Sequence, residues 1–388
     1  MNAEDYVERA AGLQPLLEQA APRMERERKL TPDVVAALHQ AELYRLLLPR
    51  SLGGAELAPA DFVRAIEAIA KADASTAWCL AQAGGCAMAA AYLDPAAARE
   101  IFGPANAVLA WGPPNPSGRA LAVDGGYLLN GTWQFASGSR HATWLGAHAA
   151  RVDRDGNRLP NPAGPQYEPT LLFPRSSATI TDTWQVVGLK ATGSDTYSVM
   201  DLFVPSRHVL VRDDPGTRRE AGPLYKFTNY QIYGAAFAGV ALGIARSTQD
   251  AFLALAREKT SFLAAAPLRE NAAIQAQVAM CEVRLRAMRL FLLDTLRQAH
   301  DDAAQGGAID LDRRLALRMA STYSTHQASD VVDACYQAAG ATAIFESNPF
   351  ERRFRDMHAV AQQSQARMMH LEAAGRMLLG GGLQGYAV

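Results

Sequence analysis

The sequence lacks a pattern of cysteines that would suggest a disulfide framework or a metal site. Its four cysteines, Cys79, Cys86, Cys281 and Cys335, include no CxxC pair and no metal-ligand spacing. Isolated cysteines of this kind are typical of reduced, buried thiols in the cytoplasm. We therefore expect a cytoplasmic protein with no structural disulfide and no bound metal.

The sequence is also poor in net charge and in long apolar runs. The 388 residues carry a formal net charge of −1, and Lys and Arg are scattered, which disfavours nucleic acid or an anionic membrane as the main partner. The longest apolar stretches, such as AGGCAMAAAYL, are too short to span a bilayer. The acidic, amphipathic start, MNAEDYVERAAGLQPLLEQA, differs from a signal peptide. We expect no nucleic-acid partner and no membrane attachment.

Four common motifs of catalysis and nucleotide binding are missing as well. There is no GxGxxG after a strand, no Walker loop, no HExxH and no GxSxG elbow. A built-in nicotinamide or nucleoside-triphosphate site, a zinc protease and a serine hydrolase of the common type are therefore disfavoured.

The apolar pattern that is present divides the chain into three parts. Residues 1–105 carry apolar residues at helical spacing, and residues 216–388 contain longer runs of the same type. Between them, residues 106–215 show short alternating runs separated by Gly, Pro, Asn and Asp, including a DGG turn at 124–126. The pattern predicts a mainly α protein with a central β domain.

One stretch of the β domain, NGTWQFASGSRHATW at 130–144, changes character halfway. Its first half alternates like a strand, and its second half is small and hydroxylated. Such a strand end can bring backbone N–H groups and a hydroxyl close to a flat ligand. The alternative is a plain turn with a capping serine.

Three segments, in the correct order, resemble the acyl-CoA dehydrogenase superfamily over nearly the whole chain. They are LLNGTWQFASGSRHATW, VVGLKATGSDTYSVMDLFVP and CYQAAGATAIFESNPFERRFRDMHA. The resemblance implies an acyl-CoA dehydrogenase-like fold with an N-terminal helical domain, a β-barrel-like middle domain and a C-terminal four-helix bundle. It also implies a flavin wedged between these parts, and a homotetramer.

The same resemblance assigns residues to the flavin site. Ser137 falls where the family places a hydroxyl near the flavin N5, and Phe135 falls where it places an aromatic ring against the isoalloxazine. Arg257 resembles an arginine that contacts the flavin phosphate across a subunit boundary. The other cofactor-binding residues implied are Gly138, Ser139 and Ser194 and, in the phosphate-side stretch, Gln337 and Gly340.

The catalytic base of an acyl-CoA dehydrogenase is missing from both places where the family keeps it. After Arg355 and Asp356, no carboxylate follows until Glu372. The alternative position lies in NYQIYGAAFAGVALG, which contains no Asp or Glu. Removal of a substrate α-proton by a carboxylate is therefore disfavoured.

The segments RFRDMHAVAQQ, STAWCL, GRALAVDGGY and ASGSRHATW resemble a different branch of the superfamily, the two-component flavin-dependent monooxygenases. The resemblance implies reduced flavin (FADH2 or FMNH2), supplied by a separate NAD(P)H:flavin reductase, and O2 as co-substrate. It further implies hydroxylation of a small aromatic or heteroaromatic molecule, phenol-like or indole-like, through a C4a-hydroperoxyflavin. An acyl-CoA dehydrogenase or oxidase with a displaced base, and a flavin-binding scaffold without turnover, stay as alternatives.

Two residues compete for the proton-handling position in the C-terminal turn. Gln363 aligns with the histidine of that branch, while His358 lies five residues earlier. A Gln cannot act as a base at neutral pH, so either His358 serves or the substrate needs no deprotonation. The residues expected to line an aromatic pocket are Trp78, Trp111, His141, Phe227, Tyr230 and Tyr233.

Overall fold

The computed structural model describes residues 2–160, 168–262 and 265–382. The N-terminal part is helical, and its helices begin at caps that the sequence supplies. Asn2 forms a capping box with Asp5 at the start of α1, and the Asp73 carboxylate accepts from the Thr76 N–H at the start of α5. The helices are α1 (Ala3–Gly12), α2 (Gln14–Glu27), α3 (Pro32–Gln40), α4 (Pro59–Ala70), α5 (Ala74–Ala87) and α6 (Pro95–Phe102).

Helix α5 is held between two neighbours by its glycines. A Cβ atom at Gly84 would collide with the ring of Phe62 on α4, and one at Gly85 would collide with the ring of Tyr233. The close approach that these glycines allow fixes α5 against the bundle. Trp78, on the same helix, is thereby held at a defined place beside the β domain.

The described strands of the middle part form two sheets. One has the order β1 (Leu109–Trp111), β4 (Trp144–His148), β6 (Pro169–Pro174), β9 (Val209–Val211). The other has the order β5 (Ala150–Val152), β2 (Arg119–Val123), β3 (Gly126–Ala136), β8 (Asp195–Pro205), β7 (Thr179–Thr181). β2 and β3 form a hairpin at the predicted turn, where Gly125 has a φ of 75°. Trp133 and Tyr197, with ring centroids 5.4 Å apart, form part of its core.

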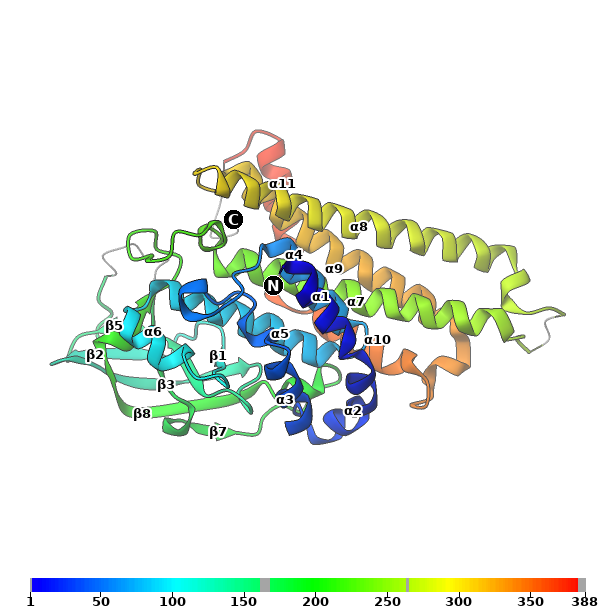
Figure 1. Cartoon of the computed structure of the whole chain (residues 1–388). Helices are drawn as coiled ribbons and strands as arrows, with labels where there is room; N and C mark the ends of the chain where they lie inside the picture. The colour runs from blue at the N-terminus through cyan, green and yellow to red at the C-terminus, as the bar shows by residue number, and fades with distance from the viewer. Residues whose placement is uncertain (1, 161–167, 263–264, 383–388) are drawn as a thin grey trace.

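The C-terminal part returns to helices: α7 (Asn229–Glu258), α8 (Ala272–Ala304), α9 (Leu311–Ala339), α10 (Pro349–Ala361) and α11 (Met369–Leu378). Figure 1 shows α7, α8 and α9 as long rods that extend beyond the N-terminal helices on the side opposite the strands. The sequence of helices, strands and helices confirms the predicted fold class. The predicted boundaries at 105/106 and 215/216 fall between α6 and β1 and between β9 and α7.

The bundle and the N-terminal helices share one hydrophobic core. Gly239 and Gly243 of α7 bring this helix close to α4, where Cβ atoms at these positions would press on Val63 and Ala70. None of the described helices combines the length and the apolar composition that a membrane crossing requires.

Candidate functional site

The end of β3 carries a bulge that separates Phe135 from Ser137. The pairing of β3 with β8 shifts register between Trp133 and Ala136, and Phe135 has a φ of 60°. Its side chain is 58% exposed and meets the edge of Trp184 with the centroids 5.9 Å apart. Ser137, two residues on, is buried. The bulge therefore presents an aromatic ring on the surface beside a buried hydroxyl.

The Ser137 hydroxyl begins a directed chain of hydrogen bonds. Its Oγ lies 2.7 Å from Ser194 Oγ, which lies 2.7 Å from Thr192 Oγ1. Thr192 donates to the carbonyl of Leu189 at 2.9 Å. Because each hydroxyl has one proton, Thr192 must accept from Ser194, and Ser194 must accept from Ser137.

A tryptophan occupies one of the two lone pairs of the Ser137 hydroxyl oxygen. The indole Nε1–H of Trp78 donates to Ser137 Oγ at 3.0 Å. A hydroxyl oxygen has two lone pairs, so Ser137 keeps one lone pair and no proton for a further partner. The tip therefore offers an acceptor, and a ligand that docks there must bring a donor.

The flanking residues of the tip are fixed by the loop that precedes β8. Gly138 N–H donates to the carbonyl of Thr192 at 2.9 Å, and Ser139 Oγ donates to the carbonyl of Gly193 at 3.2 Å. A Cβ atom at Gly138, which has a φ of 80°, would come within 3.2 Å of His141 Nε2. The structure thus brings Ser137, Gly138, Ser139 and Ser194 together at the end of β3.

Asp356 supports this loop and was not among the predicted site residues. The buried carboxylate on α10 accepts from Leu189 N–H at 2.6 Å. Burial raises the pKa of Asp356 to about 7, against the lowering effect of this hydrogen bond. Gly188 packs on the carbonyl of Arg355, so the Arg-Asp pair holds the loop that carries the hydroxyl chain. In the sequence, the adjacent Arg355 and Asp356 were the signal that could have pointed to this role.

A row of three aromatic rings runs from the tip into the bundle. Trp78 stacks on Phe237 of α7 with the centroids 3.8 Å apart and the planes at 8°. Phe237 stacks in turn on Tyr233, at 5.7 Å and 7°. The row ends in polar contacts, since Tyr233 Oη lies 3.5 Å from Cys86 Sγ and accepts from Gln82 Nε2 at 3.4 Å. Phe237 and Gln82 were not predicted.

The other predicted pocket residues lie outside this row. Trp111 and Phe227 are fully packed in the core, although the Trp111 carbonyl accepts from Gln82. His141 is buried beside Tyr44, and burial lowers its pKa to about 4, so its ring is neutral. Tyr230 lies one turn before Tyr233 on α7 and faces α9.

The structure separates the two candidates of the C-terminal turn. His358 Nε2 lies 2.9 Å from Asp333 Oδ1, and its side chain is 40% exposed. Gln363 instead caps a short 3-10 segment, where its Oε1 accepts from Gln365 N–H at 2.9 Å. Its Nε2 is buried and has no hydrogen-bond partner among the described residues. Gln365 packs near Gly234, which places this turn against the α7 segment that carries Phe237.

Three predicted phosphate-side residues lie far from the tip. Arg257 is on the last turn of α7, about 30 Å beyond Phe237 at the rise of an α-helix. Gln337 and Gly340 are at the C-terminal end of α9. Lys259 Nζ donates there to the carbonyl of Ala339 at 2.5 Å. One chain therefore does not bring these residues to its own Ser137.

The buried carboxylates around the tip are engaged in other contacts. Asp195 pairs with Arg140, whose Nε lies 2.6 Å from Oδ2. Asp73 caps α5, and Asp356 binds Leu189 N–H. None of these three carboxylates is therefore free to act as a base for dehydrogenation.

Comparison with known proteins gives the family. The N-terminal domain of acyl-CoA dehydrogenases matches residues 10–100, and the C-terminal domain matches residues 235–368. Indole-3-acetate monooxygenase of Pseudomonas putida is 30% identical over 92% of this chain and 89% of that protein. The oxygenase component of a FADH2-dependent resorcinol hydroxylase, from a Rhizobium species, is 30% identical over 96% of this chain and 92% of its own.

Among solved structures, 3-HSA hydroxylase from Rhodococcus sp. RHA1 superposes with a TM-score of 0.90 and 26% identity, over 99% of both chains. The predicted use of reduced flavin and O2 is confirmed by these relatives. The chain therefore belongs to the acyl-CoA dehydrogenase superfamily, as an oxygenase component of its flavin-dependent monooxygenases.

Proposed function

We propose that the protein hydroxylates a small, electron-rich aromatic or heteroaromatic molecule at the tip of β3. Reduced flavin, when bound, supplies the two electrons with which O2 is split, so that one oxygen atom enters the ring and the other leaves as water. A separate NAD(P)H:flavin reductase provides the reduced flavin, because the sequence has no nicotinamide-binding motif after a strand.

The single observation that carries this proposal is the direction of the hydroxyl chain. Ser137 donates to Ser194 and accepts from Trp78, which leaves one lone pair. The N5 atom of a reduced flavin carries an N–H, whereas N5 of the oxidised form carries only a lone pair. The tip thus fits the reduced form, and Ser137 would hold it at N5. Phe135, exposed beside Trp184, offers the apolar face on which a flat ring can lie.

Gln363 aligns with the histidine of the monooxygenase branch, and its side-chain amide can donate a hydrogen bond as that histidine can. Its Nε2–H2 group is buried without a partner among the described residues, and its Oε1 is already used by Gln365. It can therefore orient an oxygen atom of the reactants but cannot remove a proton. His358 is held by Asp333. We infer a substrate that needs no deprotonation, such as an indole-like ring.

The aromatic row supplies the binding surface for such a ring. Trp78, Phe237 and Tyr233 stack on one another with nearly parallel planes, so a planar substrate would lie along their edges or on the outer face of the row. Gln82 and the Tyr233 hydroxyl at the end of the row can recognise a ring heteroatom. The names of the similar proteins, an indole-3-acetate monooxygenase and a resorcinol hydroxylase, support an aromatic substrate.

We also propose that the protein forms a homotetramer. The outer faces of α8 and α9 expose an apolar set in which Phe291 meets the edge of Tyr323. Its members are Met280, Val283, Leu290, Phe291 and Tyr323. Contact between copies would cover this set. It would also let Arg257, Gln337 and Gly340 reach the flavin of a neighbouring subunit. Light scattering of the purified protein tests this assembly.

The test of the activity is an aerobic assay with isotopically labelled O2. Purified protein is mixed with FMN or FAD, a generic flavin reductase, NADH and a panel of indoles, phenols and aromatic acids. We expect a product that carries one labelled oxygen atom, detected by mass. Hydrogen peroxide as the sole product with every substrate would contradict the proposal. Reduction of tightly bound FAD by an acyl-CoA would favour the dehydrogenase alternative.

A further inference from the structure

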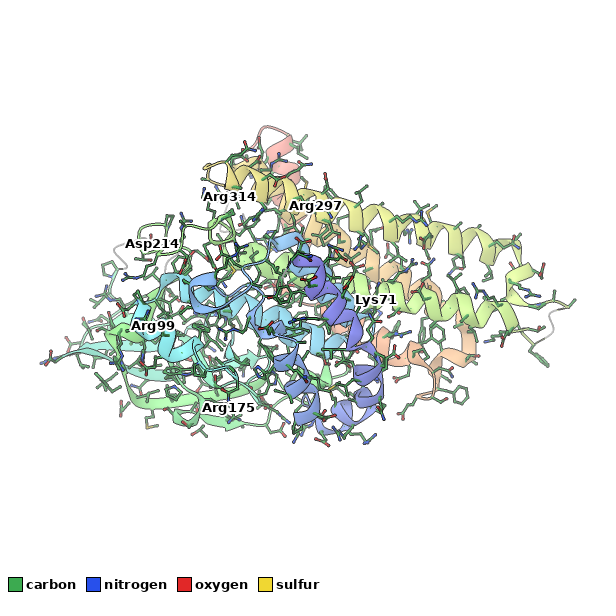
Figure 2. All side chains as sticks on the ribbon, in the orientation of Figure 1. Lys71, Arg99, Arg175, Asp214, Arg297 and Arg314 are labelled. Carbon is green, nitrogen blue, oxygen red and sulfur yellow. The ribbon has the colours of Figure 1, made fainter. Side chains whose placement is uncertain are left out.

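A buried arginine in the bundle has no charged partner among the residues that the structure describes. Arg318 of α9 is 5% exposed. No carboxylate of the described residues lies within ion-pair distance of its guanidinium, whereas Arg313 on the same helix pairs with Asp302. The guanidinium carbon lies 4.1 Å from the centroid of the Tyr230 ring. Burial of a cation without a counter-charge is costly, so this arrangement favours the entry of an anion. Figure 2 marks Arg314, one turn before Arg318 on α9.

The neighbours His370 and Arg367 add no negative charge near Arg318. His370 of α11 meets the edge of Tyr230 at 6.2 Å, and its Nε2 donates to the carbonyl of Ser364 at 2.8 Å. Burial lowers the pKa of His370, and the charges of Arg318 and Arg367 lower it further. Burial also lowers the pKa of Arg318, an effect that Tyr230 partly offsets. An anion at this place would therefore be attracted by the guanidinium, which has no carboxylate of the described residues within ion-pair distance.

The arginine lies at the end of the segment that carries the aromatic row. Tyr230 precedes Tyr233 by about 4.5 Å along the axis of α7, and Phe237 lies about 10 Å beyond Tyr230. Gly234, between them, faces Ser321 of α9, with 3.6 Å from its ideal Cβ position to Ser321 Oγ. A molecule that lies along the edges of these stacked rings and points its polar end toward Tyr230 would thus direct that end to Arg318.

We propose that Arg318, seated on Tyr230, binds the carboxylate of the substrate, and that this enzyme acts on aromatic acids. The inference rests on the proposed function, because the ring of the acid would occupy the aromatic row. A guanidinium binds a carboxylate through two parallel N–H donors. Arg318 then sets specificity through the side chain of the substrate and does not touch the reacting ring carbon.

The flavin phosphate is the other anion that could use an arginine. Arg318 lies on Tyr230, one turn before Tyr233, at the end of the aromatic row that would hold the ring of the substrate. The location of Arg318 beside the aromatic row therefore favours the carboxylate of the substrate.

The test compares acids with their neutral amides. Indole-3-acetate, 4-hydroxyphenylacetate and benzoate are each paired with the corresponding amide and titrated anaerobically, by calorimetry, into protein with excess reduced FMN. For at least one pair, wild-type protein should bind the acid at least about tenfold more tightly than the amide. Arg318→Gln should abolish this preference and leave the affinity for the amide unchanged. Arg318→Lys should keep part of it, and the control Arg313→Gln should keep all of it.

Several results would overturn the proposal. Equal affinity of wild-type protein for acid and amide in every pair would do so without any variant, which keeps the test valid if Arg318→Gln does not fold. Weaker binding of FMN but not of riboflavin by Arg318→Gln would assign the arginine to the flavin phosphate. Acid binding that depends on Arg318, without hydroxylation of any acid, would refute the proposed function and keep the subsite. Equal kcat/KM for acids and amides would refute the subsite and keep the function.

Discussion

Trp78 links the tip of β3 to the α7 segment on which the C-terminal turn also packs, and the tip and the turn differ in how far their polar groups are satisfied. At the tip, Ser137, Ser194 and Thr192 form a chain in which every proton is used. In the turn, Gln363 Nε2 is buried with no partner among the described residues. A satisfied network holds its geometry before a ligand arrives, whereas an unsatisfied donor gains its partner from the ligand. We infer that the tip holds the flavin in place and that Gln363 in the turn gains its hydrogen-bond partner when the reactants bind.

The largest effect on stability and flavin affinity is expected from Asp356→Ala, which removes the support of the tip. Asp356→Ala leaves the Leu189 N–H buried without an acceptor, which costs about 1–3 kcal/mol of unfolding free energy. The loop that carries Thr192 and Ser194 should loosen, and flavin affinity should fall. Chemical denaturation and flavin titration measure both effects. Asp356→Asn is the matched control, since its amide oxygen can still accept from Leu189; an equal loss in both variants would contradict this role.

The same carboxyl predicts a pH dependence of stability. Burial raises the pKa of Asp356 to about 7 from the ordinary 3.8, so the folded state binds this proton more tightly than the unfolded state. Its contribution to stability should therefore be complete below pH about 4 and should be lost as the pH rises toward about 7. Asp356→Asn should lack this loss when denaturation curves are compared across that range. Parallel curves for the two proteins would contradict the assignment.

The role of the turn can be tested by comparing variants of its two candidate residues, Gln363 and His358. Gln363→Ala removes one hydrogen bond of about 0.5–1.5 kcal/mol to the reactants, which should slow coupled hydroxylation by about two- to tenfold. Flavin binding should be unchanged. His358→Ala removes a half-exposed contact with Asp333, worth about 0–1 kcal/mol, and should leave the rate and its pH profile intact. A changed pH profile in His358→Ala would return the proton-handling role to that residue.

The sequence allowed prediction of the fold because the evidence for it is local. Helical spacing, the hairpin turn at Gly125 and the change of character within residues 130–144 are all visible in short windows. What it could not supply are contacts between distant segments. Leu189 and Asp356 are separated by 167 positions, and a single sequence carries no sign that they meet. The same holds for Arg318 on Tyr230 and for Phe237 on Trp78.

The central claim is that Ser137 accepts a hydrogen bond from reduced flavin, and an anaerobic titration tests it most directly. Reduced and oxidised FMN are each titrated into wild-type protein and into Ser137→Ala. Wild-type protein should bind the reduced form more tightly, and Ser137→Ala should lose about 0.5–1.5 kcal/mol of that preference, with oxygen consumption shifting from product to hydrogen peroxide. Ser117→Ala, an exposed serine of the same domain, should change neither. An unchanged preference and unchanged coupling in Ser137→Ala would contradict the placement of the flavin at the tip of β3.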